Sequence, residues 1–115
     1  MSHKRLSRKV TKRRDRVHLF VALGDQTRLY LVAKLSSGQP YSISELATGS
    51  KLTRQAITKH LRVLERVGIV HSVHVGRKSL FEFDPGPMAE IREYLDFVSA
   101  EWGRALSRLK SFVEE

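Results

Sequence analysis

Three polar side chains that can recognise nucleic-acid bases lie close together, at Arg54, Gln55 and Thr58. An arginine can donate two parallel hydrogen bonds to guanine, a glutamine can pair with adenine in a similar two-point manner, and a threonine can contact either base. Lys59 and Arg62 follow, and their longer cationic side chains suit phosphate oxygens. These residue types offer non-covalent recognition of a duplex, provided that one helix presents them together.

The stretch LTRQAITKHLRVLERVG, residues 52–68, has the pattern of such a helix. Thr53 is a suitable N-cap and Gly68 a suitable C-terminal stop. Apolar residues at helical spacing predict one buried side, formed by Ala56, Ile57, Leu61 and Leu64. All five polar residues then lie on the other side. Taken alone, they are also explained by an ordinary solvated face.

A short helix is predicted immediately before this one. In SISELA, Ser42 and Glu45 have the spacing of a capping box, and Gly49 stops the helix. Its inward residues are expected to be Ile43, Leu46 and Ala47. Two helices joined by the short turn TGSK, the second with a polar outer face, predict a helix-turn-helix whose second helix enters a major groove.

A β-hairpin is predicted directly after the helix-turn-helix. IVHSVHV, residues 69–75, is rich in β-branched residues, and SLFEF, residues 79–83, alternates in polarity. The Gly-containing turn GRK separates them. A hairpin in this place is typical of a winged helix, and Arg77 and Lys78 would then lie beside DNA phosphates. A merely polar turn is the alternative.

Two further helices are predicted before the helix-turn-helix, and one long helix after the hairpin. RVHLFVALG ends at Gly24, and Asp25 can cap the next helix, whose buried side is expected to be Leu29, Val32, Ala33 and Leu35. The last helix is expected over about 86–113. Apolar residues spaced alternately by three and four form a heptad seam along it: Met88, Ile91, Leu95, Val98, Trp102, Ala105, Leu109 and Phe112.

The basic charge is concentrated toward the N-terminus. Residues 1–16 hold eight Lys or Arg against one Asp, a net +7, residues 17–87 hold nine against five, a net +4, and residues 88–115 hold four against six, a net −2. This asymmetry favours a polyanionic partner. We expect a flexible basic arm at 1–13, a DNA-binding domain at 14–84 and a dimerisation helix at 85–115.

Composition excludes several function classes. The chain has no cysteine, so disulfides, thiolate metal sites and thiol switches are excluded. No apolar run approaches the roughly 20 residues of a membrane span, and no secretory signal is evident, so a cytoplasmic protein is expected. No nucleophile elbow or Gly-rich phosphate loop occurs, and Glu90, Glu93 and Asp96 are better explained as a solvated face. An enzyme is therefore not expected, nor a cofactor.

The segments FVALGDQTRLYLVAKLSSG, SISELATGSKLTRQAITKHLRVLERVGIV and GRKSLFEFDP resemble the ArsR-type winged-helix repressors. The resemblance runs from Phe20 to Asp84 and into the last helix. It implies a homodimeric repressor bound to an inverted-repeat operator. It also implies a dimer interface built from the first and last helices, here Phe20, Ile91, Leu95, Val98, Trp102 and Leu109.

Both metal-sensing sites of that family are missing from this sequence. The Cys-x-Cys expected near Glu45–Ala47 is absent, and residues 88–115, which correspond to the helix with the Asp, His and Glu ligands, contain no histidine. Among the other histidines, His60 is expected to contact phosphate or to pack, and His71 and His74 point to opposite faces of a strand. His3 and His18 are isolated, which leaves a new site across a dimer as the only metal alternative.

We therefore expect a sequence-specific regulator of transcription that binds double-stranded DNA. Arg54, Gln55 and Thr58 would contact bases, and the DNA backbone would be held by Lys59, Arg62, Arg77, Lys78, Lys12, Arg13 and Arg14. The alternatives are a protein-interaction module built on a winged helix and a nucleic-acid coating protein without sequence preference. The inducing signal is not specified by the sequence.

Overall fold

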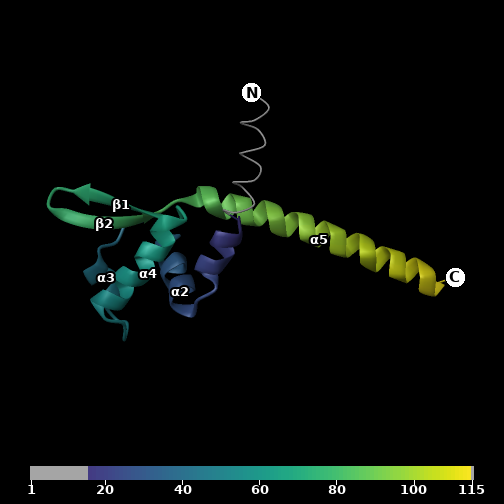
Figure 1. Ribbon diagram of the computed structural model, residues 1–115, viewed down its shortest axis with the longest axis horizontal. Coiled ribbons are helices and arrows are strands. Elements are labelled where there is room, and N and C mark those ends of the chain that lie inside the picture. Colours follow the sequence, from purple (N-terminus) through teal and green to yellow (C-terminus); the bar gives the residue numbers. More distant parts are fainter. Residues whose placement is uncertain (1–15, 115) are drawn as a thin grey trace, which may run out of the picture.

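The computed structural model describes residues 16–114, so the basic arm predicted at 1–13 and the phosphate contacts predicted for Lys12, Arg13 and Arg14 lie outside the described residues. In chain order the structure contains a helix at residues 16–23, α2 (Gln26–Leu35), α3 (Ile43–Ala47), α4 (Arg54–Arg66), β1 (Val70–Val75), β2 (Lys78–Phe83) and α5 (Pro85–Glu114) (Figure 1). This confirms a mostly helical fold with one hairpin.

One apolar core joins these elements. Its buried members are Leu19, Ala22, Leu31, Leu35, Leu46, Ile57, Leu61, Leu64, Ile69, Val70, Phe81 and Ile91. They come from every helix and from both strands, so α3, α4 and the hairpin form a unit that is closed by the 16–23 helix and α2.

The buried side of α2 differs from the sequence prediction. Leu31 and Leu35 are fully buried, whereas Leu29 is 52% exposed and Ala33 is also exposed. The inward side begins at Arg28, one turn before Leu31. The spacing of apolar residues did not predict the inward side of α2 correctly, because the first residue on that side, Arg28, is charged.

Local signals fix where the helices begin. The Asp25 carboxylate accepts a hydrogen bond from the Arg28 backbone N–H at 3.0 Å and so caps α2. At α3, the Ser42 hydroxyl accepts from the Glu45 N–H and the Glu45 carboxylate accepts from the Ser42 N–H, which completes the predicted capping box.

The hairpin turn is shorter than predicted. Val75 pairs with Lys78, so only Gly76 and Arg77 form the turn and Lys78 belongs to β2. Gly76 has φ of 65°, as the first central position of a type II′ hairpin turn requires. Tyr41, between α2 and α3, exchanges two backbone hydrogen bonds with Phe81, at 3.0 and 2.8 Å. This bridge fastens the start of α3 to the hairpin.

The last helix extends away from the rest of the molecule (Figure 1). Its first turn is fixed by Asp84, whose carboxylate accepts from the Gly86 N–H at 2.9 Å. Met88 and Ile91 pack against the core, and beyond them α5 contributes nothing to it. In residues 16–114 no helix combines the length and the apolar character needed to cross a membrane.

Candidate nucleic-acid interface

The recognition helix α4 has well-defined ends. The Thr53 hydroxyl accepts from the Ala56 N–H at 3.1 Å and caps the first turn. At the other end, the Gly68 N–H donates to the Glu65 carbonyl and the Ile69 N–H to the Leu64 carbonyl, both at 3.0 Å. With φ of 79° at Gly68, these bonds form a Schellman motif. The predicted helix is confirmed at both ends.

The predicted base-contacting residues lie together at the N-terminal end of α4. Arg54 and Gln55 are exposed in the first turn, and among residues 16–114 neither side chain has a hydrogen-bond partner. Thr58 lies one turn further and is partly buried. Its hydroxyl donates to the Arg54 carbonyl at 2.8 Å, so its lone pairs and methyl group are what remain for a ligand.

The two cationic residues further along α4 differ from each other. Lys59 is exposed, whereas the Arg62 guanidinium pairs with the Glu65 carboxylate at 2.7 Å. The Ser72 hydroxyl of β1 also donates to Glu65, at 2.7 Å, and this bond, followed by the Arg62 contact, lowers the pKa of Glu65. A phosphate bound to Arg62 would have to compete with an ionised carboxylate.

The wing, defined here as β1, β2 and their turn, carries the second basic group. Arg77 lies in the turn and Lys78 at the start of β2, and both are exposed. The base of the wing is fixed on two sides. Ser72 bonds to Glu65 of α4, and the His71 imidazole lies 2.7 Å from the Asp84 carboxylate. The Gly86 N–H, followed by His71, lowers the pKa of Asp84.

Arg28 connects three helices, a role that the sequence analysis missed. Its Nε donates to the Ala22 carbonyl at 2.6 Å, at the C-terminal end of the 16–23 helix. Its Nη1 lies 3.2 Å from Nδ1 of His60 on α4, and that nitrogen is 3.7 Å from the Asp25 carboxylate. The backbone N–H of Arg28 is the largest cause of the lowered pKa of Asp25. The motif LGDQTRL, with Asp25 and Arg28 three residues apart, was the available signal.

The histidines of the described residues have distinct surroundings. His60 has the packing role that was one of its two predicted roles, because Arg28 and Asp25 occupy its Nδ1 side. His71 contacts Asp84, and His74, three positions along β1, is exposed. Within residues 16–114, no three His, Cys, Asp or Glu side chains gather closely enough to hold a metal ion.

The residues predicted for a dimer interface differ in how far they are exposed. Leu95, Val98, Trp102 and Leu109 are exposed by 51%, 41%, 64% and 59% on the far part of α5. Phe20 is 38% exposed and its ring meets that of Tyr94 edge-on, with centroids 5.6 Å apart. Ile91 differs from this prediction: it is only 7% exposed, because it packs into the core of its own chain.

Comparisons with known proteins agree with this geometry. Residues 25–72, from the cap of α2 to β1, match the bacterial regulatory protein family arsR. The HTH-type transcriptional regulator Rv2034 of Mycobacterium tuberculosis is 32% identical over 93 residues, which cover 81% of this chain and 83% of that protein. The uncharacterized HTH-type transcriptional regulator YuzN of Bacillus subtilis is 35% identical over 79 residues, covering 64% of this chain and 86% of YuzN.

A solved structure extends the match beyond residues 25–72. The ArsR-like transcriptional regulator from Rhodococcus sp. RHA1 superposes with a TM-score of 0.73 at 35% sequence identity, over 85% of this chain and 92% of that one. The helix-turn-helix and wing described above are therefore those of a winged helix-turn-helix protein. On its sequence and its fold, the chain belongs to the ArsR family of bacterial regulatory proteins.

Proposed function

We propose that this protein regulates transcription by binding DNA as a homodimer, and that it represses by occupying an inverted-repeat operator. The observation that carries the proposal is the exposed N-terminal end of α4, where Arg54 and Gln55 have no hydrogen-bond partner within residues 16–114. Exposed Arg and Gln side chains in the first turn of a helix suit base edges in a major groove.

The surrounding cations would hold the DNA backbone. Lys59 lies one position beyond Thr58 on α4, and Arg77 and Lys78 lie at the tip of the wing. Phosphate contacts of this kind set the register of a protein on a duplex without discriminating sequence. Arg62 joins them only if phosphate displaces Glu65, so we assign it a smaller part.

The uncovered seam of α5 is the reason to propose a dimer. Leu95, Val98, Trp102 and Leu109 lie along one heptad stripe, and each remains at least 41% exposed in the single chain. A stripe of this length is typically covered by another helix. A two-fold dimer presents two copies of α4 to one duplex, which matches inverted half-sites separated by about 10 bp or a multiple of it.

Selection of bound duplexes from a random pool tests this function. We expect the full-length protein to enrich a palindromic sequence. Against that sequence, Arg54→Ala and Gln55→Ala should each lose about 1–3 kcal/mol of discrimination at particular base pairs. Lys110→Ala, which changes an exposed cation near the end of α5, is the matched control. Unchanged selectivity in both α4 variants would remove the base-contacting assignment.

The same selection separates the alternative functions. Tight binding without any enriched sequence would favour a coating protein, and absence of DNA binding would favour a protein-interaction module. The role of residues 1–13 needs a second measurement. Deleting them should weaken binding to all duplexes and flatten the dependence of affinity on salt, because phosphate contacts release counterions.

A further inference from the structure

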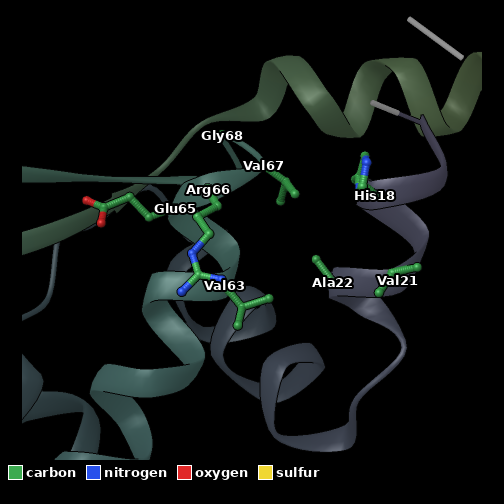
Figure 2. Close-up of a pocket in the computed structure, with 8 residues that line it drawn as sticks. All are labelled: His18, Val21, Ala22, Val63, Glu65, Arg66, Val67 and Gly68. Atoms are coloured by element: carbon green, nitrogen blue, oxygen red, sulfur yellow. The ribbon is translucent and has the colours of Figure 1, made fainter. Parts of the chain in front are cut away.

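A cleft separates the 16–23 helix from the C-terminal end of α4 (Figure 2). Its volume is about 620 Å³, within the range of about 300–1,000 Å³ that is usual for small-molecule sites. The cleft lies at the other end of α4 from Arg54 and Gln55, and it is therefore not part of the surface proposed to contact bases.

The two walls of the cleft are largely apolar. Val63 and Val67 line the α4 side, and Val21 and Ala22 line the opposite side (Figure 2). Val21 is 63% exposed and Ala22 is buried. A ligand that fits between these walls must have an apolar body.

The polar groups of the cleft give it a positive character. The Arg66 side chain lies beside Val63, whereas the Glu65 carboxylate points away from the cleft (Figure 2). Glu65 is held there by Ser72 and Arg62, each at 2.7 Å. Within residues 16–114, Arg66 has neither a hydrogen bond nor an ion pair from its side chain. Its guanidinium is therefore available to an anion.

We propose that this cleft binds a small amphipathic monocarboxylate, such as a medium-chain fatty acid. The apolar chain would lie between Val63 and Val67 on one side and Val21 and Ala22 on the other. The carboxylate would accept hydrogen bonds from the Arg66 guanidinium, a geometry that arginine favours.

The position of the cleft links this ligand to DNA binding, a step that rests on the proposed function. One wall is the helix that carries the base-contacting residues, and the other is the 16–23 helix, which carries Phe20 of the proposed dimer interface. A ligand that prefers one spacing of these two helices shifts the equilibrium between spacings. Ligand affinity and DNA affinity then change each other by the same factor.

Calorimetric titration of the full-length protein, without DNA, tests the site. The probes are decanoate, kept below its aggregation concentration, and decanamide, which has the same chain without the charge. We expect one decanoate per protein chain and a preference for decanoate over decanamide. Arg66→Gln should reduce that preference by roughly threefold to tenfold. Arg104→Gln, an exposed arginine of α5 paired with Glu101, is the control and should leave it unchanged.

A second variant tests the location independently of charge. Val63→Phe narrows the cleft and should weaken both probes, while thermal unfolding verifies that the variant is folded. Equal decanoate preference in Arg66→Gln and wild type, undiminished binding of both probes by Val63→Phe, or absence of saturable binding would each overturn the proposal. Because the titration contains no DNA, a failure to select an operator would refute the proposed function and leave this result standing.

The link to DNA is then measured on the selected operator. Saturating decanoate should change the operator affinity of the wild-type protein and leave that of Arg66→Gln unchanged. An unaltered wild-type affinity would refute the link between the cleft and α4.

Discussion

The two ends of α5 lie in opposite environments although both are apolar. Ile91 is 7% exposed and belongs to the core, whereas Trp102, three turns later on the same seam, is 64% exposed. Further along, Phe112 reaches 79%. The part of the chain from residue 16 to Ile91 builds the apolar core, and the rest of α5 contributes no residue to it. The boundary between the core of the single chain and the surface proposed to pair with a second chain therefore lies inside one helix.

The largest expected effect comes from placing charge on the exposed part of the seam. Leu95→Asp combined with Leu109→Asp should abolish the proposed dimer, because four buried leucines per dimer contribute at least about 6 kcal/mol, or a factor above about 10⁴ in the dissociation constant. Sedimentation equilibrium measures the change. Glu101→Gln, off the seam on the same helix, is the control. A double variant that still sediments as a dimer would place the interface elsewhere.

The next prediction compares a core position with a position on the far part of α5. Both substitutions are made in the Leu95→Asp, Leu109→Asp background, where the protein is expected to be monomeric. Leu61→Ala removes a fully buried side chain and should lower the free energy of unfolding by about 2–5 kcal/mol. Leu106→Ala, at a position that is 47% exposed, should change it by less than about 0.5 kcal/mol. Urea unfolding followed by circular dichroism gives both values. Comparable losses would show that the far part of α5 is packed within one chain.

A smaller effect on the free energy of unfolding is expected at Arg28, which connects the 16–23 helix, α2 and α4. Arg28→Met keeps the aliphatic stem but leaves the Ala22 carbonyl and the His60 imidazole without their donor. We expect a loss of about 1–3 kcal/mol in the free energy of unfolding. Arg92→Met, an exposed arginine on α5, should be nearly neutral. If the two substitutions cost the same, the contacts of Arg28 contribute little.

The smallest effect concerns pH. The backbone N–H of Ser42, followed by its hydroxyl, lowers the pKa of Glu45 from its ordinary value of 4.5. Because the folded pKa is the lower one, the stabilisation is present above pH 4.5 and is lost as the pH falls through the folded pKa. Glu45→Gln should therefore lower the melting temperature at pH 7, and the difference should vanish by about pH 2. A difference that grows on acidification would contradict this sign.

Features with local causes could be predicted from the sequence. Thr53 and Gly68 bounded α4, and Ser42 and Glu45 started α3, because caps involve residues only a few positions apart. Contacts between residues far apart in the sequence could not be predicted in this way. The Tyr41–Phe81 bridge and the Arg28–His60 contact join residues 40 and 32 positions apart, and neither leaves a periodic pattern.

The candidate site shows the same limit. The sequence placed Arg54 and Gln55 on one exposed surface, since helical periodicity determines that directly. The spacing of Arg62 and Glu65 on one helix was a local signal for their ion pair. It could not show that Ser72 of the hairpin also bonds to Glu65. Nor could the sequence separate the buried from the exposed residues of the heptad seam. Ile91 and Leu95 both fit the heptad pattern and differ only in what packs over them.

The Arg28 junction also bears on how far apart two binding half-sites can be. Arg28 fixes the 16–23 helix to α4, and Tyr94 fixes the same helix to α5 through Phe20 and through the Arg16 guanidinium, 5.0 Å from the Tyr94 ring centre. Such a linkage limits how far the surface proposed to pair two chains can move relative to the helix proposed to enter the groove. A dimer built this way would act as a molecular ruler, with little tolerance for a base pair inserted at the centre of its operator.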